Sequence, residues 1–158
     1  MQLGRGDGLV LSDDASLIDI DRVCVWLGES YWAHDRDRAT IERSLAHSMP
    51  FGVYAEGTQI AFTRATTDLA SFCWLGDVVV DEQWRGRGVG TWMVGAVVEH
   101  LRELGVPRFV LATRDAHGVY AKIGFTPLRV PETWMEIDGR RTRPNPGDVR
   151  LPGNLAPS

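Results

Sequence analysis

Residues 78–94 read VVVDEQWRGRGVGTWMV, and this stretch decides how the rest of the chain is interpreted. The valine run at 78–80 is typical of a buried strand, and the segment after residue 90 carries apolar residues at helical spacing. Between them, the loop RGRGVG at 85–90 holds three glycines. Glycine in or beside a helix costs about 1 kcal/mol relative to alanine. The loop therefore indicates a backbone with left-handed angles or one that comes close to another group.

A loop that joins a strand to a helix directs several backbone N–H groups at one point, next to the positive end of the helix dipole. Such a loop predicts an anion site, where Arg85 and Arg87 would add charge-assisted hydrogen bonds to phosphate. Two common phosphate loops do not fit. The chain has no Gly-Lys pair for a P-loop, and a G-x-G-x-x-G pattern from Gly88 would need glycine at Met93. The alternative is a glycine-rich turn without a ligand.

Hydrophobic periodicity predicts the elements on either side of the loop. Toward the N-terminus we expect a strand at 8–12, helices at about 19–29 and 38–48, a hairpin over 51–65 that turns at Glu56-Gly57, a polar turn at 66–70, and a long strand at 71–81 with a bulge at Gly76. Toward the C-terminus we expect a helix over 91–104 that ends at Gly105, a strand at 108–113, a short helix within 115–125 and a last strand around 133–137.

The strand–helix–strand order makes 71–80 and 108–112 parallel neighbours. We therefore expect one domain over 1–137, of the α/β class with a mixed (α+β-like) sheet. From residue 138 onward the proline-rich sequence predicts a flexible tail.

The composition, 44% hydrophobic and 24% charged with a net charge of -4, is that of a soluble globular protein. The acidic balance disfavours a nucleic acid as partner. No apolar run approaches about 20 residues, so we expect no membrane partner. The N-terminus shows no signal-peptide pattern, which leaves the cytoplasm by elimination. Cys24 and Cys73 have no metal-ligand spacing, so we expect free thiols in preference to a disulfide, and no metal.

Two signatures resemble those of the GNAT superfamily of acyl-CoA-dependent N-acyltransferases. Arg85, Gly88 and Gly90 fill the pattern Q/R-x-x-G-x-G/A after a strand that ends in valine. Further on, the stretch from Ala116 through Tyr120 to Gly124-Phe125 matches A-x-x-x-Y-x-x-x-G-F. The order of elements agrees over roughly 8–137. The sequence departs from the family at Thr113, where an asparagine often contacts the cofactor.

The resemblance implies a GNAT-like fold, in which a mixed central sheet with a splayed parallel strand pair is flanked by helices. It also implies acetyl-CoA as co-substrate. Dimers are common in the family, so a homodimer is compatible with the resemblance, although the sequence does not set the oligomeric state. The residues implied to bind acetyl-CoA lie at the end of one parallel strand, in the glycine loop and after the other strand: Val78, Val79, Val80, Arg85, Gly86, Arg87, Gly88, Val89, Gly90, Thr91, Thr113 and Ala116.

The catalytic candidates are Tyr120 and Asp77. Tyr120 matches the position of a general acid that protonates the leaving thiolate; the alternative is a phenol that only packs on the sheet. Asp77 is the candidate general base, because it is a carboxylate in an otherwise apolar strand just before the cofactor-binding segment. A structural role for Asp77, with ordered water as the base, is the open alternative.

Acceptor binding is expected from aromatic side chains and from one histidine: Tyr31, Trp32, Trp74, His117 and Trp134. Such a pocket favours a small aromatic or cationic amine, which the carboxylates Glu29, Asp35 and Asp77 would attract. The predicted function is transfer of an acetyl group to a primary amine of a small molecule by direct attack on the thioester. The alternatives are a protein or peptide N-acetyltransferase, favoured by an open acidic cleft, and a catalytically weak acyl-CoA-binding module.

Overall fold

The computed structural model describes residues 1–139, and the chain divides into two compact units, Met1–Phe125 and Thr126–Ser158. In the described part of the second unit the ordered element is a 3-10 helix, Pro131–Thr133. The strand predicted around 133–137 is therefore wrong. Pro131 fixes the backbone for a turn, which Thr133 closes by donating both its N–H and its hydroxyl to Val130 O. The tail predicted from residue 138 lies almost entirely outside the described residues.

The first unit is built on a six-stranded sheet in the order β1-β2-β3-β4-β5-β6. Its strands are β1 (Gln2–Gly4), β2 (Leu9–Ser12), β3 (Met49–Ala55), β4 (Thr58–Thr67), β5 (Cys73–Val80) and β6 (Phe109–Val110). Neighbouring strands are antiparallel except for β5 and β6, which are parallel. The mixed sheet and its parallel pair are thus confirmed.

The strand bounds differ from the predictions in three places. β1 was not predicted, because three exposed residues carry no alternation of apolar and polar side chains. β4 continues through Thr67, into the turn predicted at 66–70. The strand predicted at 108–113 shortens to Phe109–Val110, because only these two residues pair with β5. The hairpin is confirmed: Glu56 and Gly57 have φ of 49° and 79°, the positive pair that a type I′ turn requires.

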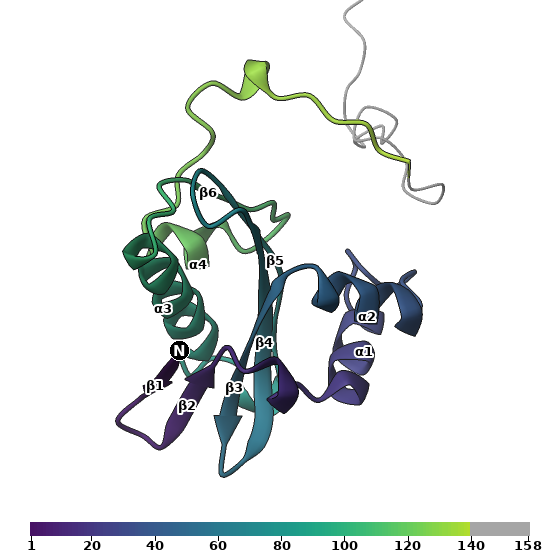
Figure 1. The fold of residues 1–158 in the computed structure, drawn as a ribbon, viewed down its shortest axis with the longest axis vertical. Helices are drawn as coiled ribbons and strands as arrows, with labels where there is room; N and C mark the ends of the chain where they lie inside the picture. The colour runs from purple at the N-terminus through teal and green to yellow at the C-terminus, as the bar shows by residue number, and fades with distance from the viewer. Residues whose placement is uncertain (140–158) are drawn as a thin grey trace, which may run out of the picture. The chain divides into compact units, whose positions relative to one another are not determined.

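The helices are α1 (Ile20–Gly28), α2 (Arg38–Ala46), α3 (Val89–Glu103) and α4 (His117–Ala121), with short 3-10 helices at Ala15–Leu17 and Glu82–Trp84. Asp19 caps α1 and Asp37 caps α2, each by accepting a hydrogen bond from a backbone N–H of the first turn. Figure 1 shows α3 and α4 on one face of the sheet and α1 and α2 on the other. No helix of the described range 1–139 is long and apolar enough to cross a membrane.

The sheet carries an apolar core on each face, and β5 contributes to both. Leu75 packs in the cluster under α3, whereas Val79 packs in the cluster under α1 and α2. These residues are four apart, so in a regular strand their side chains would point to the same face. They point to opposite faces because an extra residue in β5 shifts the alternation between them. This irregularity lies at the centre of the candidate site.

Candidate active site

β5 and β6 are paired at two positions only, Cys73 with Phe109 and Trp74 with Val110. β6 then ends, whereas β5 continues to Val80. From Leu75 onward, this edge of β5 has no neighbouring strand within residues 1–139. An open edge presents backbone N–H and C=O groups that need partners. The unpaired edge of β5 beyond Trp74, called the slot below, is therefore open to hydrogen bonding with an extended polar group.

Alternation along β5 decides which backbone groups face the slot. Asp81 N donates to Ile60 O at 2.9 Å, and Val79 lies opposite Phe62 in the ladder with β4. The main-chain groups of Val79 therefore face β4, and those of Val78 and Val80 face the slot. Arg85 Nε donates to Val80 O at 3.1 Å. Of the three valines in the predicted cofactor segment, Val78 and Val80 thus contribute main-chain groups, whereas Val79 contributes its side chain to the core.

The bulge in β5 is centred on Asp77, not on Gly76 as predicted. Phe62 pairs with Val79 and Arg64 pairs with Gly76, so two residues of β5 lie opposite Thr63. Asp77 has a φ of 55°, a left-handed angle that aspartate tolerates better than most residues. Gly76 has a different role: a Cβ there would lie 3.3 Å from the indole nitrogen of Trp74.

Two arginines hold the Asp77 carboxylate, whose side chain is only 3% exposed. Arg36 Nη1 lies 2.9 Å from both carboxylate oxygens, and Arg64 Nε lies 2.5 Å from Oδ2. Arg36 belongs to the loop that joins α1 to α2, so the ion pairs attach this loop to the bulge. The arrangement favours the structural role for Asp77 over that of a base, because the lone pairs that would accept a proton already accept hydrogen bonds from guanidinium groups.

The glycine loop opens α3 next to the end of β5. Gly86 and Gly88 have φ of 76° and 72°, and a Cβ at either would meet nothing within 4 Å. At Gly90, a Cβ would lie 3.3 Å from Val80 Cγ2, so this glycine lets α3 pack closely on β5. Two glycines therefore supply left-handed angles beside open space, and the third supplies a close approach.

The start of α3 has the features of an anion site. Gly88 is the N-cap and provides no side-chain hydrogen bond. Trp92 N donates to Gly88 O at 3.0 Å, and the N–H groups before it in the first turn have no intrahelical acceptor. The Arg87 guanidinium lies 4.9 Å from the centre of the Trp84 ring, and Arg85 is anchored on Val80. Both predicted arginines thus place positive charge at the rim of this loop.

Tyr120 lies on α4. Just before this helix, Thr113 Oγ1 accepts a hydrogen bond from the N–H of the N-cap residue Ala116 at 3.0 Å. The Tyr120 ring packs edge-on against Phe125, with the ring centres 5.9 Å apart. Burial raises the pKa of Tyr120 to about 12, with smaller contributions from Tyr31 and Asp115. The phenol is therefore protonated at neutral pH. Because its hydroxyl has no hydrogen-bond partner in the part of the chain that the structure describes, it has the state that a proton donor needs.

The loop between α1 and α2 reaches the segment just before α4. Tyr31 Oη accepts a hydrogen bond from Arg114 N at 3.1 Å, and the Arg114 guanidinium lies 3.8 Å from the centre of the Tyr31 ring. Tyr31 also packs edge-on against Trp32, with centres 5.0 Å apart. These contacts bring Tyr31 and Trp32, two of the predicted acceptor-binding aromatics, next to the segment that leads into α4, the helix of Tyr120.

The remaining predicted acceptor residues are Trp74, His117 and Trp134. Trp74 lies on β5 and is 38% exposed, and His117 is the exposed first residue of α4. Trp134 belongs to the second unit, and its role stays a prediction. Sequence reasoning missed Arg36, Arg64 and Arg114, since isolated arginines form no recognisable spacing and only the fold brings them to the slot.

Comparison with known proteins identifies the family. The model of the acetyltransferase (GNAT) family matches residues 17–125, which is more than half of the chain. The chain belongs to this family. A crystal structure of a GNAT family member from Xanthomonas campestris pv. campestris is 42% identical and covers 82% of this chain and 92% of that one, with a TM-score of 0.78.

Two relatives carry more specific names. Glucosamine 6-phosphate N-acetyltransferase 1 of Oryza sativa subsp. japonica is 44% identical over 55 residues, which cover 34% of this chain and 33% of the rice protein. The chain thus matches about a third of the length of this curated relative. The crystal structure of glucosamine-6-phosphate N-acetyltransferase from Arabidopsis thaliana covers 75% of this chain and 91% of that one, at 18% identity and a TM-score of 0.58. This second likeness shows the shared GNAT fold.

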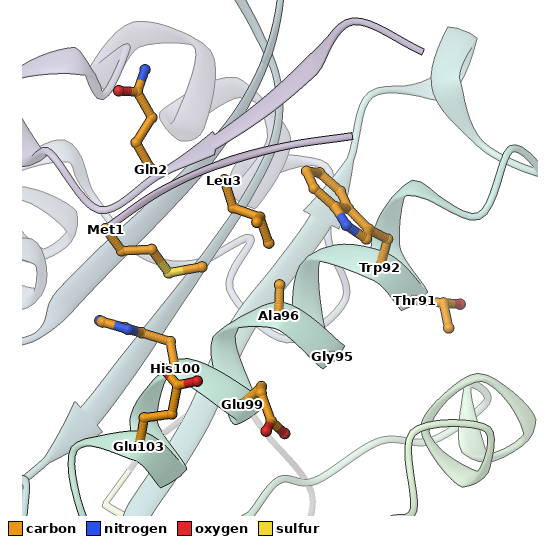
Figure 2. Close-up of a pocket in the computed structure, with 10 residues that line it drawn as sticks. All are labelled: Met1, Gln2, Leu3, Thr91, Trp92, Gly95, Ala96, Glu99, His100 and Glu103. Carbon is orange, nitrogen blue, oxygen red and sulfur yellow. The ribbon is translucent and has the colours of Figure 1, made fainter. Parts of the chain in front are cut away.

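The first unit, Met1–Phe125, is called the GNAT unit below. It also has a hollow of about 580 Å³, which is lined by the start of the chain with β1 and by α3 (Figure 2). Met1 and Leu3 reach over α3 toward Ala96, and Trp92 stands at one end. Thr91 lines this hollow as well, although it was predicted to contact acetyl-CoA. The hollow is separate from the slot, since none of its lining residues belongs to β5, β6 or α4. Among the described residues, no group of three or more His, Cys, Asp or Glu side chains is placed to hold a metal ion.

The GNAT unit should lose stability in alkaline solution. Both cysteines are free thiols, and burial raises the pKa of Cys73, which lies in β5, from 9.0 to about 11. The unfolded chain loses this proton near pH 9, whereas the folded chain keeps it up to about pH 11. The free energy of unfolding is thus constant below pH 9 as far as Cys73 is concerned, and it falls between pH 9 and 11.

Denaturant unfolding at pH 8, 9, 10 and 11 measures this loss. The Cys73→Ala variant should show a shallower fall over the same range, whatever its stability at pH 8. A Cys73→Ala slope equal to that of the wild type would contradict this explanation.

Proposed function

We propose that this protein transfers an acetyl group from acetyl-CoA to a primary amine of a small molecule, by direct attack of the amine on the thioester. The observation that carries the proposal is the end of β5–β6 pairing after Trp74 and Val110, beside a glycine-rich helix start. Membership of the GNAT family supports the reaction type, and the name of the rice relative supports a small amine as acceptor.

The residues of the slot fit acetyl-CoA. The main-chain groups of Val78 and the N–H of Val80 face the slot and suit the amides of the pantetheine arm, which is an extended chain, whereas Val80 O accepts a hydrogen bond from Arg85 Nε. The N–H groups at the start of α3, with Arg85 and Arg87, suit the pyrophosphate. The open space above Gly86 and Gly88 leaves room for phosphate to approach the backbone. Bound there, acetyl-CoA would supply the activated acetyl group.

The chain itself would supply polarisation and a proton. A backbone N–H on the slot side of β5 donates to the thioester carbonyl and stabilises the charge that develops on its oxygen. Tyr120 Oη gives its proton to the departing sulfur, and because burial raises the pKa of this phenol, the hydroxyl carries that proton at neutral pH. We assign Asp77 to positioning, since Arg36 and Arg64 hold its carboxylate. Water is then the acceptor of the proton that the amine releases.

Two alternatives make different demands on the same site. A protein or peptide acetyltransferase was expected to have an open acidic cleft, and the ion pairs of Asp77 with Arg36 and Arg64 do not favour one. A binding module without turnover does not need an unpartnered phenol at the slot.

Detection of free CoA thiol across a panel of amines and peptides tests the proposal. We expect release that requires both acetyl-CoA and a primary amine. Binding of acetyl-CoA without release on any acceptor would favour the binding module. If no CoA thioester raises the melting temperature of the protein, the proposed function is wrong.

A further inference from the structure

The ion-pair group at the bulge carries more positive than negative charge. Arg36 and Arg64 bring two positive charges, and Asp77 brings one negative charge. The side chains of the two arginines are 26% and 16% exposed, so solvent and salt screen this charge less than charge on the open surface. The bulge therefore holds a half-buried surplus of one positive charge beside the slot.

The two guanidinium groups also keep unused hydrogen-bond donors. Arg36 bonds to Asp77 through Nη1 alone, and its Nε and Nη2 have no acceptor among residues 1–139. Arg64 bonds to Asp77 through Nε and to Thr66 Oγ1 through Nη1 at 3.3 Å, and its Nη2 has none in the same range. Guanidinium donors in a planar fork match the oxygens of a carboxylate or a phosphate.

These donors lie next to an exposed aromatic surface. In the β4–β5 ladder, Arg64 lies opposite Gly76 and Thr66 lies opposite Trp74. Gly76 has no side chain, and the exposed Trp74 indole lies against its backbone. Figure 1 shows this end of β4 and β5 extending past α1 and α2, the helices on that face. An acceptor that enters here meets an indole and two arginines.

The carboxylates nearby do not cancel the surplus. From the sequence, Asp77 was expected to attract a cationic acceptor. In the structure, its carboxylate already forms ion pairs with Arg36 and Arg64. Asp115 lies 3.8 Å from Arg114 Nη2. Glu29 and Asp35 are exposed side chains of the α1–α2 loop, where water screens them. The half-buried charge, which acts most strongly on a bound molecule, is positive.

We infer that the acceptor carries an anionic group, a carboxylate or a phosphate, in addition to its amine, and that Arg36 and Arg64 bind this group beside Trp74. The inference rests on the proposed acetyl transfer and specifies its substrate class. It replaces the cationic acceptor expected from the sequence, because that expectation depended on a free Asp77.

Matched pairs of acceptors test the inference by turnover. The phosphate arm compares 2-aminoethyl phosphate with 2-aminoethanol, and the carboxylate arm compares amino acids with their amides. We expect kcat/KM to be at least about tenfold higher for the anionic member of one pair, since hydrogen bonds to charged groups are strong. The Arg36→Gln variant should lose this advantage. Arg38→Gln should keep it, because Arg38 is bound to Asp21 and Glu42 on the surface of α2.

A binding measurement separates this inference from the proposed function. Inorganic phosphate is titrated into the protein with saturating CoA, which occupies the glycine loop, and Trp fluorescence is recorded. We expect saturable binding in the wild type and in Arg38→Gln, and its loss in Arg36→Gln, even if no amine is acetylated. In the wild type alone, phosphate should inhibit competitively with the acceptor, a measurement that does not need Arg36→Gln to fold.

Equal kcat/KM within both pairs, or higher kcat/KM for the uncharged members, would overturn the inference while leaving acetyl transfer intact. Absence of saturable phosphate binding in the presence of CoA would also overturn it. Absence of turnover on every amine, with phosphate binding that depends on Arg36, would contradict the proposed function alone.

Discussion

Replacing Tyr120 with phenylalanine should lower kcat by about 100-fold, the lower end of the range for a lost general acid or base. Tyr120→Phe keeps the ring that packs against Phe125 and removes only the hydroxyl, which has no hydrogen-bond partner among the described residues. We therefore expect little change in melting temperature or in affinity for acetyl-CoA. Steady-state kinetics and calorimetric titration of CoA measure these quantities separately.

Tyr54 provides a matched control for this variant. Burial also raises the pKa of Tyr54 to about 12, and its buried hydroxyl has no partner within residues 1–139, but it lies on β3, away from the slot. Tyr54→Phe should leave kcat unchanged. If Tyr120→Phe turns over as fast as wild type, Tyr120 is not the proton donor and its role is to pack on the sheet.

Replacing Asp77 with alanine should destabilise the protein by about 3 kcal/mol, because it leaves two partly buried guanidinium groups without their carboxylate. It also releases the α1–α2 loop from the bulge, so the KM for the acceptor should rise. Asp21→Ala is the control: Asp21 pairs with Arg38 at the surface, its side chain is 83% exposed, and its loss should cost about 0.5 kcal/mol or less. Urea unfolding of the three proteins gives the comparison.

The pH dependence of Asp77→Asn distinguishes positioning from base catalysis. An asparagine cannot take a proton from the amine, so a catalytic base at this position would carry the acidic limb of the pH–rate profile. If Asp77 positions the loop, Asp77→Asn should keep the wild-type acidic limb at a reduced rate. Disappearance of that limb would identify Asp77 as the base and contradict the positioning role.

The sequence was sufficient for the parts of the site that rest on backbone geometry. Gly86 and Gly88 indicated left-handed angles, and both have positive φ. The apolar run before them indicated a buried strand, and the strand–helix–strand order indicated a parallel neighbour for it. These properties are local or follow from chain order, so periodicity and glycine placement predict them.

The sequence was not sufficient where two distant segments determine the outcome. The bulge was assigned to Gly76 because glycine is the usual signal, but it lies at Asp77, whose carboxylate accepts hydrogen bonds from Arg36 and Arg64. Arg36 lies in a loop 41 residues earlier in the chain and has no pattern around it. The sequence therefore indicated the glycine loop and the parallel strand pair, but it did not indicate that two arginines hold the Asp77 carboxylate.

Amide hydrogen exchange with and without CoA tests the central claim most directly, namely that the slot beside β5 and the glycine loop bind acetyl-CoA. We predict that CoA slows exchange at Val78, Val80, Gly88 and Gly90, whose N–H groups face the slot or open α3. Exchange at Gly95 and Ala96, in the hollow of Figure 2, should not change. Protection confined to the hollow, with no change along β5 and the loop, would contradict the account.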